Sequence, residues 1–196
     1  DILEDEAKAI QKEFSVIEKP VVIDLKKAHL GLVGEKSVIH EQIKALICQL
    51  TFFHSYHDLE IIAIYDEAYQ EDFQWMRWYP HFKIHTVNSV AMINSENKRD
   101  QILGSLYQIL KDRKQKEEES KKESTFLPHF LFLIDEPKWI MDHSIMEYLE
   151  KEGYNLGFSI IYTSHLRANL PENIGTIAML KNSEDGLLLI DEREEK

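Results

Sequence analysis

The sequence predicts an α/β domain with a mainly parallel sheet flanked by helices. Apolar, strand-like runs alternate with segments of helical periodicity along the 196 residues, and parallel strands need a connecting helix at each crossover. The last two runs, Thr176–Leu180 and Gly186–Ile190, are joined by a short connection containing Asp-Gly, which is typical of a hairpin at the sheet edge. We expect residues 20–196 to form one domain, preceded by a lead-in helix over residues 1–19.

The first third of the chain alternates between helical and strand-like patterns. Apolar residues from Ile2 to Phe14 recur at helical spacing and predict the lead-in helix. A second helical pattern runs from His40 to Phe53, with Ser37 or a neighbour as its cap. The strand-like runs here are rich in β-branched and apolar residues: Val21–Leu25, Leu30–Val33 and Leu59–Tyr65.

The same alternation continues to the C-terminus. A short aromatic helix is expected at Gln70–Trp78 and a long helix from about Glu96, which continues into the charged residues after Lys111 or frays there. A further helix is expected around His143–Glu150. The expected strands of this part are Lys83–Val87, Phe130–Ile134 and Phe158–Tyr162.

Charge and apolar content disfavour several classes of protein. The formal net charge of -12 at pH 7 opposes binding to the phosphates of nucleic acids, so no nucleic-acid partner is expected. No stretch approaches the roughly 20 apolar residues of a membrane span, so direct membrane insertion by this chain is not expected. The acidic start is unlike a secretory signal, and the single cysteine, Cys48, is what a reducing cytoplasm permits.

A glycine-containing segment, Gly31 to Ser37, stands where the phosphate-binding loop of an ATPase would lie. That loop needs G-x-x-x-x-G-K-[ST], because its glycines let backbone N–H groups converge on phosphates that the lysine also binds. Counted from Gly31, the required Gly-Lys-Ser falls on Lys36, Ser37 and Val38; counted from Lys36, the two glycine positions hold Leu30 and Glu35. The pattern favours a plain turn over a working cradle. No nucleotide binding is therefore expected at this degenerate loop: Gly31, Gly34, Glu35, Lys36 and Ser37.

The run from Phe130 to Glu136 matches a Walker B strand, with apolar residues followed by two carboxylates. In an active ATPase, Asp135 would organise magnesium and Glu136 would polarise water. Buried strands also end in acids that cap a following helix, and Pro137 fits such a helix start. Without a phosphate loop this structural interpretation is favoured, so Asp135 and Glu136 are predicted to be vestigial. The hydroxyl-rich end of Ser159–Ser164 resembles the polar sensor that follows a core strand in such motors.

The segment Trp75–His81 combines three large aromatic residues with a cation. Aromatic residues and arginine dominate the energetic centres of protein interfaces. The segment therefore predicts either an anchored core helix or a partner-docking surface. The docking interpretation rests on four residues: Trp75, Arg77, Trp78 and His81.

His54 and His57 lie three residues apart beside Asp58, a spacing that could ligate a metal. No third or fourth ligand is evident nearby, so a polar helix end is favoured and no metal is expected. Spacing alone assembles no Ser-His-Asp or Cys-His set either.

Taken in order, these segments resemble the FtsK/SpoIIIE-type ATPases of type VII secretion systems, the family called EssC, YukB or EccC. The resemblance rests on four stretches: Gly31–Gly34 with its following helix, Leu50–Leu59, Trp75–His81 and Ala168–Thr176. It extends from about Val21 to Ile190 and points to the domain between the membrane segments and the first ATPase domain. This resemblance implies a P-loop-ATPase-like (RecA/FtsK-like) fold.

The resemblance also implies a role. The family's first domain is degenerate, which predicts a non-catalytic regulatory and docking domain without a cofactor, coupling membrane segments to downstream ATPase domains. Its partners would be those domains and segments of the same protein, with other secretion components possible, at the cytoplasmic side of the bacterial membrane. The intact Asp135–Glu136 pair leaves an alternative open: a divergent domain that still binds and hydrolyses ATP with Mg²⁺.

Overall fold

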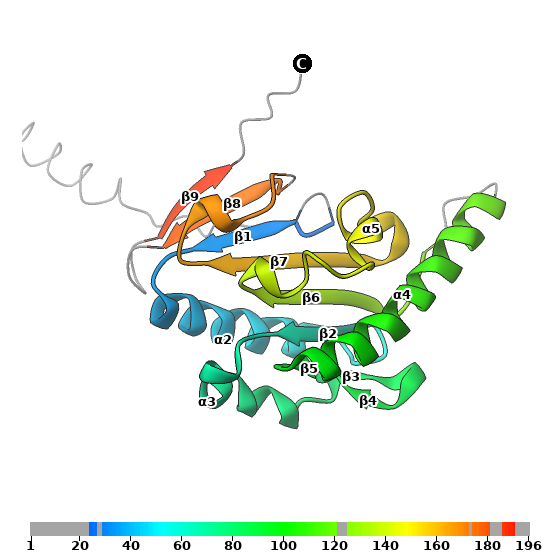
Figure 1. Ribbon diagram of the computed structural model, residues 1–196, viewed down its shortest axis with the longest axis horizontal. Coiled ribbons are helices and arrows are strands. Elements are labelled where there is room, and N and C mark those ends of the chain that lie inside the picture. Colours follow the sequence, from blue (N-terminus) through cyan, green and yellow to red (C-terminus); the bar gives the residue numbers. More distant parts are fainter. Residues whose placement is uncertain (1–23, 27–28, 121–124, 173, 181–185, 191–196) are drawn as a thin grey trace, which may run out of the picture.

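The computed structural model describes residues 24–26, 29–120, 125–172, 174–180 and 186–190. Its main element is a seven-stranded sheet in the order β5-β2-β6-β7-β1-β8-β9 (Figure 1). Neighbouring strands from β5 to β8 pair in parallel, whereas β9 pairs antiparallel with β8. The predicted parallel sheet and the C-terminal edge hairpin are therefore confirmed.

The strands of this sheet are β1 (Leu30–Val33), β2 (Leu59–Ile64), β5 (Met92–Ile93), β6 (His129–Asp135), β7 (Phe158–Ser164), β8 (Thr176–Leu180) and β9 (Gly186–Ile190). A small antiparallel pair consists of β3 (Lys83–Ile84) and β4 (Ser89–Val90). The α-helices are α2 (Lys36–Phe53), α3 (Gln70–Phe73), α4 (Glu96–Glu119) and α5 (Met146–Leu149).

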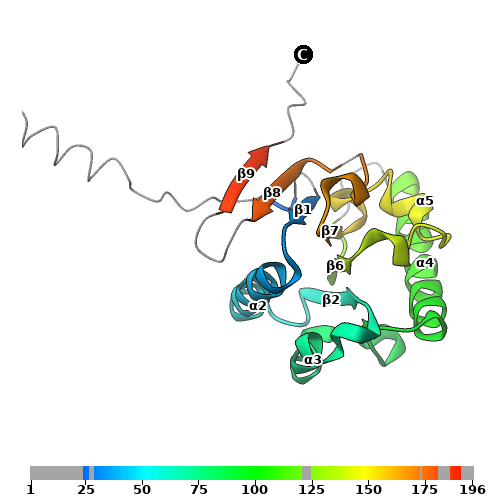
Figure 2. The same cartoon turned by 60° about the vertical axis from the view of Figure 1, so that its left-hand side comes forward.

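Helices cover both faces of the sheet (Figure 2). On one face, α2 packs through Ile39, Ile43 and Ile47, which recur every four residues and are almost fully buried. The other face carries α4 and α5. Alternate residues of β2 separate accordingly, with Ile61 on the α2 side and Ile62 on the α4 side. Burying one such side chain stabilises a fold by roughly 1.5–3 kcal/mol, so both helix layers contribute to the core.

The connection between β1 and α2 is shorter than an ATPase loop would be. Only Gly34 and Glu35 separate the two elements. The helix starts at Lys36, four residues before the predicted His40, so Ser37 lies in its first turn. Ser37 does not cap the helix: Glu35 holds that position, and its side chain makes no capping hydrogen bond.

The aromatic segment is not one helix as predicted. It consists of α3 followed by a 3₁₀ helix over Gln74–Trp78. The carbonyl of Asp72, in the last turn of α3, accepts a hydrogen bond of 2.7 Å from the Trp75 indole N–H. The Trp75 side chain thus competes with the backbone for this carbonyl. This competition and the crowding of large aromatic groups are consistent with the tighter 3₁₀ turn.

Two other expectations need correction. The strand predicted at Lys83–Val87 ends at Ile84, and a 3₁₀ turn follows that closes at Asn88 with φ 52°. The helix predicted around His143–Glu150 is reduced to the four residues of α5. Of the strand predicted at Val21–Leu25, only Asp24 and Leu25 lie among the described residues, where they precede or form a turn. The lead-in helix over residues 1–19 lies outside the described residues.

The long helix predicted from Glu96 is confirmed and continues through the charged run to Glu119. None of the helices in the described part of the chain is both long and apolar enough to cross a membrane.

Candidate functional site

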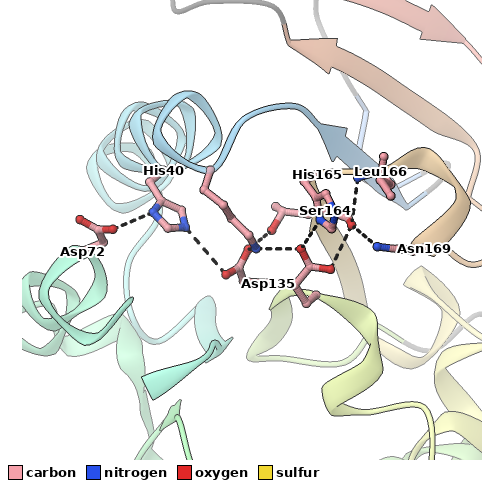
Figure 3. A network of polar contacts seen from close by, with 10 residues as sticks. His40, Asp72, Asp135, Ser164, His165, Leu166 and Asn169 are labelled. Carbon is pink, nitrogen blue, oxygen red and sulfur yellow. Dashed lines mark hydrogen bonds and ion pairs between the residues drawn. The ribbon is translucent and has the colours of Figure 1, made fainter. Parts of the chain in front are cut away.

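The parallel pairing brings the predicted ATPase-like residues together at the carboxyl edge of the sheet. Val33, the last residue of β1, stands opposite Ser164 of β7, and Asp135 of β6 stands opposite Thr163. Lys36 follows β1 at the start of α2. Residues that are about 100 positions apart in sequence therefore meet in one polar network, seen from close by in Figure 3.

Lys36 is the cation of this network. Its Nζ lies 2.9 Å from Oδ1 of Asp135 and 2.8 Å from Oε1 of Glu136. Burial alone would lower the pKa of Lys36, but hydrogen bonds and charge from the two carboxylates raise it above its ordinary value. The ammonium group is therefore held as the counter-ion of the two acids.

Asp135 is fully buried. Its Oδ1 also accepts a hydrogen bond of 2.7 Å from Thr163 Oγ1. Burial raises the pKa of Asp135, yet the nearby His40 ring, the hydrogen bonds from Thr163 and Lys36 and the Lys36 charge outweigh it and hold the pKa below its ordinary value. The carboxyl is thus charged at neutral pH.

Glu136 has an unusual backbone. Its φ of 68° lies in the left-handed region, which costs a non-glycine residue on the order of 1–3 kcal/mol. Its carboxylate accepts hydrogen bonds from Ser164 Oγ at 3.0 Å and from His165 at 3.3 Å, besides Lys36. Burial raises the pKa of Glu136, but Lys36 first and His165 and Ser164 next bring it below its ordinary value. These contacts hold the side chain in place despite the strained backbone.

Four residues of the network carried no sequence signal for this site: His40, Asp72, His165 and Asn169. His40 Nδ1 donates to the carboxylate of Asp72 in α3 at 2.9 Å, and its Nε2 faces Asp135 at 3.8 Å (Figure 3). Asn169 donates to Ser164 Oγ at 3.2 Å. Only the fold brings them here, although His40 could have been noticed as a polar residue beside the buried stripe of α2.

The surroundings of Gly34 decide whether a triphosphate fits. The Gly34 N–H donates to the Ser164 carbonyl at 3.2 Å. A Cβ atom placed on Gly34 would lie only 2.6 Å from the carbonyl oxygen of Leu180, so β8 closes this side of the turn. Gly31 lies inside β1, and the exposed Glu35 and Ser37 flank Lys36. This two-residue turn, with a committed Gly34 amide and a neighbouring carbonyl, differs from a phosphate-binding loop, whose glycines let several amides converge on the phosphates.

The four residues of the predicted docking surface separate into two pairs. Trp78 is 80% exposed, and the Arg77 guanidinium lies 5.4 Å from its ring centre. Trp75 is half-buried, and His81 is buried, with Nε2 2.7 Å from the carbonyl of His54. Arg77 and Trp78 are therefore accessible to a partner, whereas Trp75 and His81 anchor the segment. Among the residues for which the structure gives positions, no group of three or more metal-ligating side chains gathers.

No family model matches the chain. It is 35% identical to the ESX secretion system protein EccC of Geobacillus thermodenitrificans over 195 residues, and 36% identical to YukB of Bacillus subtilis. It is 33% identical to the type VII secretion system protein EssC of Staphylococcus aureus. Each match covers 99% of this chain. This chain is homologous to a segment of the EccC/YukB/EssC type VII secretion ATPases. It spans 13% of the length of these relatives.

Solved structures of EccC and EssC confirm the predicted ATPase-like fold. EssC (ATPases 2 and 3) from G. thermodenitrificans superposes with a TM-score of 0.62 at 13% identity, covering 79% of this chain and 32% of that one. The cytoplasmic domain of Thermomonospora curvata EccC gives 0.56 at 12% identity, covering 87% of this chain and 21% of that one. At these identities the likeness concerns the fold alone.

Proposed function

We propose that this chain is the membrane-proximal, ATPase-like domain of a type VII secretion protein and that it docks neighbouring domains instead of hydrolysing ATP. The observation that carries this proposal is the pairing of Lys36 with both Asp135 and Glu136 beside a two-residue turn. In a working site the lysine binds the outer phosphates and the acids serve magnesium and water. Here each group has an internal partner.

Residues 20–196 would form this domain, and residues 1–19 would lead in from membrane segments on the cytoplasmic side. The homology to secretion proteins that are much longer than this chain supports a position among further domains. The net charge of -12 supports a role without nucleic acid. A structural neighbour, T. curvata EccC (ATPases 2 and 3), was solved in complex with a signal sequence peptide.

A divergent, active ATPase is the second candidate. It is favoured by one observation: Lys36, Asp135 and Glu136 converge at the carboxyl edge of the sheet, where parallel α/β proteins bind their ligands. For this function the lysine would have to exchange both carboxylates for phosphates.

Calorimetric titration with Mg-ATP separates the two candidates. We expect no saturable heat up to 1 mM nucleotide, roughly the limit set by a binding free energy of about -4 kcal/mol, because Lys36 is already paired with two carboxylates and these would repel the phosphates. A parallel thermal melt with and without nucleotide should give the same midpoint. Micromolar affinity that disappears in Asp135→Ala would contradict the proposal and favour the active ATPase.

The proposed docking surface consists of Arg77 and Trp78. A tryptophan that is 80% exposed beside a guanidinium is typical of an interface anchor, since both residue types are enriched at energetic centres. The half-buried Trp75 and the buried His81 fix the backbone on either side. This rigid support lowers the entropy that a partner must overcome on binding.

Trp78→Ala is expected to weaken binding to the domain that follows in the parent protein by about 2 kcal/mol, or roughly 30-fold in Kd. Titration of this chain with that domain measures the change. Met141→Ala, which truncates another exposed apolar side chain in a different segment, should leave Kd unchanged. Equal Kd values for the unaltered chain and Trp78→Ala would show that the partner does not use this surface.

A further inference from the structure

A large cavity opens at the edge of the sheet opposite the polar network. Its volume is about 840 Å³. It is lined at the amino ends of β2, β6 and β7 by residues that include Leu59, His129 and Ser159. The network around Lys36 lies at the carboxyl ends of β1, β6 and β7. The two places are therefore separated by the length of the strands.

The cavity has an apolar wall and a rim of exposed apolar side chains. Leu50, Leu59 and Leu131 contribute to its wall. At its opening, Leu127 is 62% exposed and Tyr154 is 44% exposed. Phe53, adjacent to the lining residue His54 in α2, is also largely exposed. Exposed apolar side chains gathered around a hollow mark a surface that another group covers.

Two polar side chains of the cavity wall, Ser159 and His129, already have partners. Ser159 Oγ donates to the Leu25 carbonyl at 2.8 Å, so its only hydrogen is used. His129 Nε2, 2.9 Å away, must therefore be the donor to Ser159. Burial lowers the pKa of His129 to about 4, and the charge of Arg113 adds to this, so the imidazole is neutral. An occupant gains little from these groups and would be held mainly by apolar contact.

The chain enters the domain at this cavity. Asp24, Leu25 and Lys26 form part of its lining, and the hydrogen bond from Ser159 fixes Leu25 there. Residues 20–24 are the only connection between this anchor and the segment 1–19. Five extended residues reach at most about 17 Å. A short tether of this kind raises the effective concentration of the segment at the cavity to roughly the millimolar range.

We propose that the segment 1–19 docks its apolar side chains into this cavity. The sequence places Leu3, Ala7, Ile10 and Phe14 on one face of the predicted lead-in helix. A helix that lays such a face into an apolar groove is a common mode of recognition. The cavity volume suits a few side chains and is far too small for a folded domain. The docked segment would couple whatever precedes residue 1 to the amino edge of the sheet.

Hydrogen exchange of the full chain, read by mass spectrometry, tests this proposal. In Ile10→Ser/Phe14→Ser, the cavity-lining stretches 50–59 and 125–131 are expected to exchange about tenfold faster or more, the change that follows when a large apolar side chain loses its burial. The segment 1–19 should itself lose protection. The remaining part of β6, residues 132–135, lies away from the cavity lining and should be unchanged, which shows that the variant is folded.

The matched control is Asp5→Ser/Lys12→Ser, which alters the opposite face of the predicted helix without changing the net charge. It should exchange like the unaltered chain. A reciprocal variant at the rim, Leu127→Ser, should release the segment and raise its exchange. The proposal is overturned if residues 1–19 of the unaltered chain exchange as an unstructured peptide, or if the serine pair leaves the cavity stretches unchanged. Protection that grows with protein concentration, together with a dimeric mass, would also overturn it, because a second copy would then fill the cavity.

Discussion

Lys36→Met is expected to destabilise the fold by about 3 kcal/mol at pH 7, a large share of the stability of a typical domain. Methionine keeps the length and most of the packing of lysine, so the change isolates the charge. It leaves the fully buried Asp135 beside Glu136 without the cation that both contact within 3 Å. Removing one partner of a buried ion pair costs far more than the pair contributes when intact. For a chain of this size the thermal midpoint should fall by roughly 6–12 °C.

The effect of Lys36→Met should depend on pH in a defined direction. Burial raises the pKa values of Asp135 and Glu136, but the hydrogen bonds and the charge of Lys36 outweigh it, so both lie below their ordinary values. Carboxyls of this kind contribute stability that is complete above their unfolded pKa values and is lost as pH falls through the folded ones. The difference in the free energy of unfolding between the unaltered chain and Lys36→Met should therefore be largest near pH 7 and decrease below about pH 4.

Urea denaturation at pH 7 and at pH 3.5 measures both effects. The control is Lys98→Met, which removes an exposed lysine of α4 that bonds only the Asn94 side chain among the contacts described, and its effect should stay within about 0.5 kcal/mol. If Lys36→Met were as stable as the unaltered chain at pH 7, the lysine would not be bound to the carboxylates in solution. It would then be available to phosphates, and the active-ATPase alternative would gain support.

The sheet could be predicted from the sequence because its strands are buried on both faces. Such strands have continuous apolar runs, as in Phe130–Ile134, and these need no knowledge of neighbouring segments. The short β5 escaped this reasoning, since two apolar residues do not make a recognisable run. The sequence places the start of the helix that begins at Lys36 too late, because its cap Glu35 and Ser37 in its first turn are polar and exposed.

The candidate site could be predicted only in part. The two carboxylates after a buried strand and the lysine after a glycine turn were visible in the sequence, and the parallel register brings them together. The contribution of His40 and Asp72 could not be recognised in the sequence, because their contact joins residues 32 positions apart on α2 and α3. The sequence also did not indicate which side chains of the aromatic segment are exposed to solvent. His81 is buried through a bond to the distant His54 carbonyl, whereas Trp78, three residues earlier, faces solvent.

A buried arginine on the opposite edge of the sheet supports the second large effect. Arg113 of α4 is only 6% exposed, and its guanidinium donates to three carbonyls, those of Leu156, Gly157 and Pro128, at 2.7–3.1 Å. It also lies 4.4 Å from the ring centre of Phe130. Burial lowers the pKa of Arg113 to about 10, opposed by the charge of the buried Glu60. The group is therefore charged at pH 7 and stabilises the two connections that lead into β6 and β7.

Arg113→Met should consequently destabilise the fold by about 4 kcal/mol, because three carbonyls lose their donor and the buried Glu60 loses the attraction of the Arg113 charge. Arg113→Lys keeps the charge but not the planar fork, so about half of the loss is expected. Lys116→Met removes an exposed cation from the same helix and should change little. Thermal and urea unfolding of the three variants measure their stabilities. The comparison distinguishes the contribution of the guanidinium hydrogen bonds to the free energy of unfolding from that of the positive charge. If Arg113→Lys were as damaging as Arg113→Met, the fork that spans the carbonyls would carry nearly all of the stabilisation, and the attraction to Glu60 almost none.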